Sequence, residues 1–416
     1  MNILEQPSWK ADVEKPQFSK LAENLEADTV VIGAGLAGIL TAYLLAKEGK
    51  KVVILEKKKI GSGATEYTTA FITQSIDTDT QELVDLFGVE NTRLIWQSGG
   101  EAINLLEKII LEEQIDCEFK RVSAYIYANT LKEYESLKEE QQFESELGFN
   151  VRNIKQDLEL NFRNSGHYEI PQQAKFHPLK FLFGLARKLE DMGVQIFQES
   201  EVTKLNRGDR IMAVTENGFV SAKNIVIATY QPFYNRIRLF LKRGMYISYV
   251  YEAQIPKAQL KEGLYWDTEN PYHYFRIDQG EEFDRMIIGG EDIKTMVKMD
   301  EGKNFQALED YLKTLQIEYT ITRRWAGPIL EPSDGIPLIG RVTDHEYVAT
   351  AFSGNGMTYS AISSMILSDL IQGRENAYAE VYDPKRIPSI RQLFIKGSDY
   401  LDEFFGGAIK NIFKYS

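Results

Sequence analysis

A short glycine-rich stretch contains residues whose types and spacing suggest a definite chemistry. It has the pattern GxGxxG and consists of Gly33, Ala34, Gly35, Leu36, Ala37 and Gly38. The first glycine of such a pattern makes a tight turn, the second lets the backbone approach a pyrophosphate, and the third allows a helix and a strand to pack closely. Glu56 follows Gly38 by 18 residues, a spacing at which a carboxylate accepts hydrogen bonds from a ribose diol. The combination predicts a dinucleotide-binding site.

The elements around this stretch fit that prediction. Residues 28–32 form a β-branched apolar run typical of a buried parallel strand, and residues 51–55 indicate a second strand. The residues between them have helical spacing up to Gly49, which is suited to a helix C-cap. The N-terminus of that helix would bind the phosphates. Lys57 directly follows Glu56 and is included among the cofactor-binding candidates, although the lysines at 57–59 also fit a solvated face.

Length and composition exclude several classes of protein. The chain has 416 residues, with 43% hydrophobic and 26% charged, which predicts a globular protein of two to three domains. Its single cysteine, Cys117, excludes a disulfide framework and a Cys-ligated iron–sulfur cluster, and the four histidines show no metal-ligand spacing. We therefore expect no metal. A net charge of −13 argues against a nucleic-acid partner. The N-terminus lacks a secretory pattern and no apolar run is long enough to span a bilayer, so we expect a cytoplasmic protein.

Later segments favour FAD over NAD. The sequence after Glu56 is rich in small and hydroxylated residues, which can run close to a flat flavin. Near the C-terminus, a strand is followed by a glycine turn at residues 353–356 and by a helix beginning near Met357 or Thr358. A helix N-terminus at that place would suit the negative charge that develops on a reduced flavin. An NAD-only dehydrogenase is disfavoured because it would need neither segment.

These motifs together resemble the D-amino-acid oxidase–like FAD-dependent oxidoreductases, the family that includes glycine oxidase and sarcosine oxidase. The resemblance rests on VVIGAGLAG, GSGATEYTTAFIT, NIVIAT, RRWAGPILEPSDGIPLIGR and FSGNGMTYSAISSMILSDLI, which span residues 28 to about 375. GATEYTTAFIT and the late DPKR look most like a bacterial subgroup that often carries an appended Rieske domain. With one cysteine and no CxH pair, this chain is not expected to hold such a cluster, which leaves the electron acceptor open.

The resemblance implies an α/β fold in which a discontinuous Rossmann-like, GR2-type FAD-binding domain is interleaved with a mixed or antiparallel substrate domain. The implied order is an N-terminal arm (1–27), FAD-binding parts at 28–80, 151–235 and 322–380, substrate parts at 81–150 and 236–321, and a helical tail at 381–416.

The resemblance also implies a set of FAD contacts. Besides the glycine pattern and Glu56, these are Ser62, Gly63, Ala64, Thr65, Thr68, Thr69, Val202, Thr229, Trp325, Gly327, Gly354, Asn355, Gly356, Met357 and Thr358. Some members attach the flavin through Cys or His. Cys117 lies away from every FAD motif and Tyr67 is not a histidine, so we expect non-covalent FAD.

The substrate half contains aromatic-rich strands between residues 240 and 320. By position in the family, the candidates for facing the substrate are Tyr249, Tyr251, His273, Tyr274 and Arg276. Strand alternation places His273 on one face and Tyr274 with Arg276 on the other. We favour Tyr274 and Arg276, because an arginine fork suits a substrate carboxylate. His273 is the alternative, as a general base, although hydride transfer from a neutral amine needs none.

The predicted function is FAD-dependent oxidation of a C–N bond in a small amine or amino acid. Hydride passes to flavin N5, and oxygen or a protein or quinone accepts the electrons. One alternative is a flavin-dependent 2-hydroxy acid dehydrogenase, and another is a flavin-bearing binding or assembly protein without turnover. The tail at 385–416, richer in basic residues than the rest, fits a packed helix or a contact with a redox partner or membrane surface.

Overall fold

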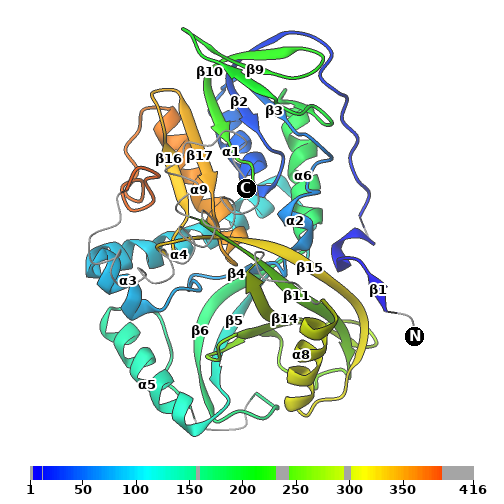
Figure 1. Cartoon of the computed structure of the whole chain (residues 1–416), viewed down its shortest axis with the longest axis vertical. Helices are drawn as coiled ribbons and strands as arrows, with labels where there is room; N and C mark the ends of the chain where they lie inside the picture. Colours follow the sequence, from blue (N-terminus) through cyan, green and yellow to red (C-terminus); the bar gives the residue numbers. More distant parts are fainter. Residues whose placement is uncertain (1–2, 12, 156–159, 231–242, 295–300, 387–416) are drawn as a thin grey trace, which may run out of the picture.

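The structure, a computed structural model, describes the whole chain except residues 1–2, 12, 156–159, 231–242, 295–300 and 387–416. Two sheets dominate it (Figure 1), one in the upper half of the view with α1 and α6, the other in the lower half with α8. Most of the C-terminal segment at 385–416, and with it the predicted tail contact, lies outside the described residues.

The eight-stranded sheet is the predicted nucleotide-binding sheet. Its strands run in the order β16-β17-β10-β2-β3-β7, with β9 and β8 added beside β10. Their bounds are Leu338–Arg341, Glu346–Thr350, Phe219–Ile227, Leu25–Ile32, Val52–Leu55, Gln195–Phe197, Ile211–Val214 and Lys204–Asn206, respectively. The four central pairings, from β17 to β7, are parallel. This arrangement confirms the Rossmann-like half of the predicted fold.

The nine-stranded sheet is mostly antiparallel and forms the second half. It has the order β1-β15-β11-β14-β13-β12-β5-β6-β4. The bounds in that order are Leu4–Glu5, Thr320–Pro332, Arg243–Ile255, Asp284–Lys294, His273–Asp278, Gly263–Asp267, Lys120–Ala128, Gly166–Lys175 and Phe71–Ile72. β13 and β14 follow each other in the chain and pair antiparallel, as in a hairpin.

Helices cover both sheets. They are α1 (Leu36–Lys47), α2 (Ala64–Tyr67), α3 (Thr80–Phe87), α4 (Val89–Glu113), α5 (Leu131–Glu146), α6 (Pro178–Asp191), α8 (Glu301–Thr314) and α9 (Gly356–Ile371), with the 3-10 turn η1 at Ser8–Lys10. None of these described helices combines the length and apolar character that a bilayer span requires.

Burial of apolar side chains explains why these elements assemble. Leu40 of α1, Ile103 of α4, Leu182 of α6 and Ile362 of α9 belong to one large buried cluster. α1 is apolar on nearly every side, as expected for a helix enclosed by other elements. A second cluster joins α8 to one face of the nine-stranded sheet.

The sheets differ from the predicted domain ranges in three places. β4 lies within 28–80, assigned to the FAD-binding domain, but pairs with β6 in the nine-stranded sheet. β6 lies within 151–235 and most of β15 within 322–380, both assigned to the FAD-binding domain, yet both strands belong to the nine-stranded sheet. β6 pairs with β5, and β15 pairs with β11 along its full length. Composition identifies a strand, but only pairing decides which sheet it joins. Val202, one of the implied FAD contacts, lies just before β8.

Candidate active site

The glycine turn lies at the carboxyl end of β2. Gly33 has φ +106°, and a Cβ there would lie 2.6 Å from the carbonyl oxygen of Ala228, which follows β10. A Cβ on Gly38 would collide with the carbonyl oxygen of Gly33. Both positions therefore exclude a side chain, and the tight turn with close helix packing is as predicted.

The N-terminus of α1 is suited to a pyrophosphate. Gly35 is its N-cap and brings no capping side chain, so first-turn N–H groups other than that of Leu36, which bonds Thr65, remain for an anion. Glu56 lies alongside, with Oε2 accepting the Ala34 N–H (2.9 Å) and Oε1 the Lys58 N–H (2.8 Å). Each carboxylate oxygen keeps a second lone pair for a ribose hydroxyl. These features fit an adenosine diphosphate moiety.

Other predicted contacts surround the same turn. Thr65 Oγ1 accepts the Leu36 N–H at 3.4 Å, and Thr229 follows β10 next to Gly33. Val202 is buried in the apolar cluster that contains Ile32 and Leu55. Ser62, Gly63 and Ala64 lead into α2, and Ser62 donates to the Lys59 carbonyl (2.7 Å). The fold thus brings together, at one edge of the sheet, residues that are far apart in sequence.

The segment after α2 is fixed by four hydrogen bonds to its carbonyl oxygens. Trp9 Nε1 donates to Thr68 (2.7 Å) and Trp325 Nε1 to Tyr67 (2.9 Å). Arg276 Nη1 donates to the carbonyl oxygens of residues 69 (3.2 Å) and 70 (3.1 Å). Gly327 lies against Tyr67, since a Cβ there would be 3.2 Å from the tyrosine Cβ. The predicted ring-contact segment is therefore held rigidly.

The position of Arg276 contradicts the prediction that its side chain faces a substrate carboxylate. Its side chain is 2% exposed, and both Nε and Nη2 donate to Asp278 Oδ1, at 3.0 and 2.7 Å. Nη1 donates to backbone carbonyls, and the guanidinium lies over the Trp9 ring, 5.3 Å from the centroid. The arginine is thus committed to an internal ion pair and to the position of residues 69–70.

The start of α9 is tied to the segment 73–77. Asn355 Oδ1 accepts the Asp77 N–H (3.2 Å), and Thr358 Oγ1 accepts the Thr73 N–H (3.1 Å). The N–H of Gly354 donates to Asp77 Oδ2 (2.9 Å). Met357 is buried in the core. The side chains of these predicted flavin contacts therefore build the turn, and the first-turn N–H groups, beginning at Gly356, are the part left to meet a ligand.

The two faces of the nine-stranded sheet separate the predicted substrate residues. Tyr249, Tyr251 and His273 lie on the face covered by α8, where His273 stacks on Tyr311 with ring centroids 3.5 Å apart and both tyrosines contact Phe305. Tyr274 lies on the opposite face, against Phe71. The alternation is as predicted, but the three side chains under α8 cannot meet a ligand on the Tyr274 face, which corrects their placement at the substrate.

Tyr274 is the centre of a polar group on its face. Its hydroxyl lies 3.0 Å from Ser248 Oγ and also bonds Thr69, while Ser248 bonds Asp292. Burial is the main reason that the pKa of Asp292 rises to about 7, and the charge of Asp77 raises it further. Asp77 is exposed, but the surrounding protein displaces enough water to raise the pKa of its carboxyl to about 6.

Sequence analysis missed Asp77, Asp292 and Ser248. Ser248 lies directly before Tyr249 in β11, so alternation could have placed it on the Tyr274 face. Asp292 was obscured because Glu291, at φ +56°, interrupts the regular strand pattern. Asp77 lies in a loop, where periodicity gives no signal.

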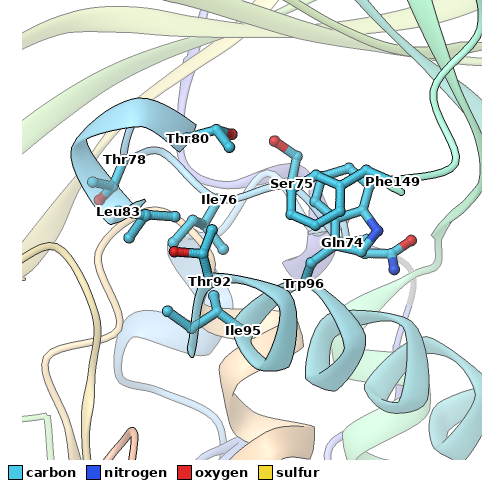
Figure 2. A pocket seen from close by; sticks show the side chains of 10 residues that line it. All are labelled: Gln74, Ser75, Ile76, Thr78, Thr80, Leu83, Thr92, Ile95, Trp96 and Phe149. Carbon is cyan, nitrogen blue, oxygen red and sulfur yellow. The ribbon is translucent and has the colours of Figure 1, made fainter. Parts of the chain in front are cut away.

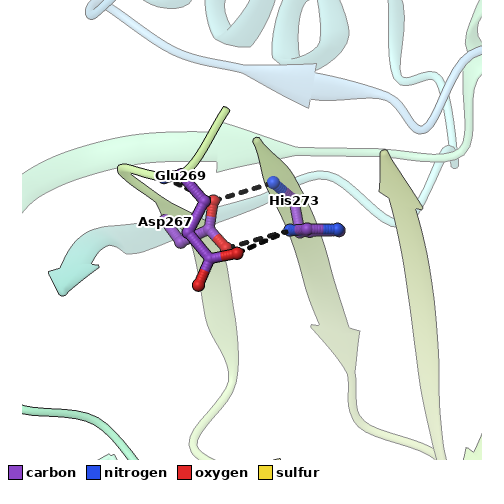
Figure 3. A group of neighbouring side chains, drawn as sticks. All are labelled: Asp267, Glu269 and His273. Carbon is purple, nitrogen blue, oxygen red and sulfur yellow. Dashed lines mark hydrogen bonds and ion pairs between the residues drawn. The ribbon is translucent and has the colours of Figure 1, made fainter. Parts of the chain in front are cut away.

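His273 belongs to a carboxylate-rich group that its sequence spacing did not reveal (Figure 3). Nδ1 lies 3.1 Å from Asp267 Oδ2, Nε2 lies 3.1 Å from Glu291 Oε1, and Glu269 is nearby. Atoms of Asp267, Glu269 and His273 that could ligate a metal lie within 4.8 Å of one another. Asn129 Nδ2 donates to the carboxylates of Asp267 (3.3 Å) and Glu269 (2.7 Å). In this arrangement each ring nitrogen of His273 has a carboxylate partner.

A small recess lies beside the segment 73–77 (Figure 2). Trp96 stacks on Phe149 at one side of it, with ring centroids 4.1 Å apart. Its volume is about 10 Å³, roughly the room that one water molecule needs. The recess therefore does not compete with the glycine turn and the Tyr274 face as a ligand site.

Comparison with known proteins agrees with this site. Residues 28–370 match the sequence model of the family DAO, FAD dependent oxidoreductase. A putative Rieske 2Fe-2S iron-sulfur protein, YhfW, of Bacillus subtilis is 30% identical over 97% of this chain and 80% of its own length. Gamma-glutamylputrescine oxidoreductase of Escherichia coli is 24% identical over 88% of each chain. Glycine oxidase from Geobacillus kaustophilus has the same fold, with a TM-score of 0.74, 21% identity, and coverage of 87% of this chain and all of that one.

The chain belongs to the DAO family of FAD dependent oxidoreductases. It is a flavoprotein enzyme that uses FAD, and its fold confirms the predicted combination of a Rossmann-like domain with a second, mainly antiparallel sheet.

Proposed function

We propose that this enzyme oxidises a C–N bond in a small amine or amino acid. The observation that carries the proposal is the meeting of two predicted cofactor segments, those of Thr69 and Gly354, with the Tyr274 face. Thr69 bonds Tyr274, Gly354 bonds Asp77, and Asp77 acts electrostatically on Tyr274. A ligand held at this junction would lie between the nucleotide-binding half and the nine-stranded sheet. Relatives named for glycine and gamma-glutamylputrescine support an amine nitrogen as the reacting group.

The residues that would hold FAD are those that already define its site. The first turn of α1 and Glu56 would bind the pyrophosphate and the adenosine ribose, and residues 62–69 would follow the ribityl chain towards the ring. The first turn of α9 would offer N–H groups and a positive dipole end to the pyrimidine side of the ring. Bound flavin supplies a two-electron acceptor for the hydride of the substrate carbon.

The chain's own residues would place that carbon and exclude water. Arg276, Trp9 and Trp325 fix the backbone of residues 67–70, so that the site is formed before a ligand arrives. Tyr274 and Phe71, in edge-to-face contact with centroids 5.7 Å apart, provide an aromatic wall on the side of the sheet. Tyr274 also keeps its phenol protonated, since burial and then the charge of Asp292 raise its pKa.

FAD is proposed to be bound non-covalently. Cys117 is 1% exposed and its backbone carbonyl pairs with His177, far from the glycine turn. Position 67, at the end of α2, is a tyrosine whose carbonyl accepts the Trp325 N–H. Neither residue offers a cysteinyl or histidyl link.

The test begins with the visible spectrum of the purified protein before and after acid precipitation. Flavin bands that move to the supernatant would support non-covalent FAD, whereas bands in the pellet would overturn that linkage. Anaerobic mixing with separate panels of amines, amino acids and 2-hydroxy acids should bleach the flavin with an amine or amino acid. Bleaching by hydroxy acids alone would replace the proposal with a hydroxy acid dehydrogenase, and no bleaching by any panel would favour a binding protein.

A further inference from the structure

The carboxylates of Asp77 and Asp292 lie on the face where the proposed substrate would bind, and no sequence motif assigned them a role. Asp77 reaches this face from the loop before α3, and Asp292 from β14. The charges of both carboxylates raise the pKa of Tyr272 and of Tyr274. Two acidic groups at one site favour a cationic ligand.

We infer that the substrate is a small diamine without a carboxylate on the reacting carbon, and that Asp292, assisted by Asp77, binds its distal ammonium group. The inference rests on the proposed amine oxidation and names the substrate class for that same site.

Asp292 has an oxygen that lacks a partner. Its Oδ1 is buried and accepts no hydrogen bond in the described structure, although the carboxylate does bond Ser248. Buried carboxylate oxygens are normally paired, because an unpaired one loses its hydration without compensation. An ammonium N–H is the donor that would complete it, and the result would be a charge-assisted hydrogen bond.

Asp77 supplies a second charge that the loop geometry keeps in place. Its Oδ2 accepts the Gly354 N–H at 2.9 Å, its own N–H donates to Asn355, and a Cβ on Gly354 would lie 2.7 Å from Oδ2. Asp77 is an exposed residue, so a ligand can approach it from solvent. Mutual repulsion of the two carboxylates would be relieved by a cation placed near both.

In the described strands β13 and β14, the basic side chains have partners away from this site. Arg276, the arginine expected in this role, is buried under Asp278 and the carbonyls of residues 69 and 70. Lys294, also in β14, has its ammonium 5.8 Å from the centroid of the Tyr246 ring. Tyr272 and Tyr274, with ring centroids 5.6 Å apart, add aromatic surface suited to methylene groups and to a cation.

The experiment compares three ligands of the FAD-loaded enzyme that differ by one group. Putrescine carries two amines, ornithine adds an α-carboxylate, and n-butylamine lacks the second amine. Dissociation constants come from the change in the flavin spectrum on anaerobic mixing, and reduction rates come from bleaching. We expect putrescine to bind at least about tenfold more tightly than either of the other two, with a Kd that rises with salt.

Two variants assign the effect to the carboxylates. Asp292→Asn and Asp77→Asn keep the shape and one acceptor oxygen, but replace the other oxygen with an NH2 donor and remove one charge each. Both variants should raise the Kd of putrescine about tenfold or more and change the Kd of n-butylamine less than about threefold. Asp116→Asn, at an exposed position after α4, is the matched control and should bind putrescine like the wild type.

The outcomes separate the two proposals. If ornithine binds as tightly as putrescine, or both variants bind putrescine normally, the diamine inference is overturned while amine oxidation stands. If no amine or amino acid reduces the flavin, the proposed function itself fails. Should Asp292→Asn not fold, the three-ligand comparison on wild type and Asp77→Asn still decides.

Discussion

Arg276 and Asp278 form a buried ion pair on β13, with Nε and Nη2 of the arginine 3.0 and 2.7 Å from one carboxylate oxygen. Burial alone would raise the pKa of Asp278, but the charges of Arg276, Arg285 and Lys175 hold it well below its usual range. The carboxylate orients the guanidinium so that Nη1 reaches the carbonyls of residues 69 and 70. A strand of the substrate sheet therefore holds the segment predicted to contact the flavin.

Replacing this arginine should affect FAD binding and stability together. In Arg276→Met, the loss of a buried ion-pair partner should lower the free energy of unfolding by about 3–5 kcal/mol. With residues 69–70 released, FAD should bind about tenfold more weakly, a difference of ~1.4 kcal/mol. Chemical denaturation and FAD titration measure the two effects.

The control is Arg152→Met, at an exposed arginine paired with Glu169 (2.8 Å), which should change neither quantity appreciably. A variant of Arg276 that keeps FAD affinity and stability but loses affinity for amino acids alone would contradict the positioning role and restore a substrate contact.

The glycine turn should not tolerate alanine at position 33. The added Cβ of Gly33→Ala would lie 2.6 Å from the Ala228 carbonyl oxygen, at φ +106°. Strain of roughly 1–3 kcal/mol should appear in the unfolding free energy, and the purified protein should carry little FAD, measured by its absorbance ratio. Gly49→Ala has φ +74° with nothing within 4 Å of the new Cβ, so it tests backbone strain alone and should retain FAD. A fully loaded Gly33→Ala variant would contradict this account of the turn.

Glu144 should make stability depend on pH. Burial is the main cause that raises its pKa from 4.5 to about 7, against hydrogen bonds from Thr80 and Tyr168 that lower it. A raised folded-state pKa stabilises the protein below the unfolded value, and this contribution is lost as the pH rises through the folded value. Through this group, the free energy of unfolding of the wild type should therefore fall by roughly 3 kcal/mol between pH 4.5 and 8, at about 1.4 kcal/mol for each unit of pKa difference.

Denaturation curves of Glu144→Gln at pH 5 and 8 should show a smaller fall than those of wild type. Glu146→Gln, at an exposed residue two positions on, should behave like wild type. Equal pH dependence in wild type and Glu144→Gln would show that Glu144 titrates normally.

The pKa values of two histidines should be shifted in opposite directions. Burial alone would lower the pKa of His273, but Asp267 and Glu291 more than reverse this and raise it above 6.5. Burial lowers the pKa of His177 to about 4. Charged His273 should therefore stabilise the fold below pH 6.5 and cease to do so as the pH rises through its folded value.

Imidazole proton resonances followed by NMR between pH 3 and 9 would show both values. The signal missing from His273→Gln identifies that residue, and a midpoint below 6.5 for it would contradict the ion-pair reading of the carboxylate group.

Cys117 should be inert in the folded enzyme. Burial raises the pKa of its thiol to about 12, so the reactive thiolate is scarce at neutral pH. A chromogenic disulfide reagent at pH 8 should react with one thiol per chain only after denaturant is added, and Cys117→Ser should still bind releasable FAD. Rapid reaction of the native protein would place the thiol in an accessible site.

The sequence by itself determined the nucleotide-binding half. The positions of Gly33, Gly38 and Glu56 follow from local rules, since a turn, a helix start and a strand end lie within a few dozen residues. Strand alternation also placed His273 and Tyr274 on opposite faces correctly.

Tertiary structure decided the rest, because it depends on contacts between residues far apart in sequence. Arg276 became a positioning residue only because the carbonyls of residues 69 and 70 lie beside it. Asp77 and Asp292 both raise the pKa of Tyr274, although they lie on a loop and a strand more than 200 residues apart in the sequence. A single sequence carries no signal for such meetings, since burial and charge at a site are set by every element packed around it.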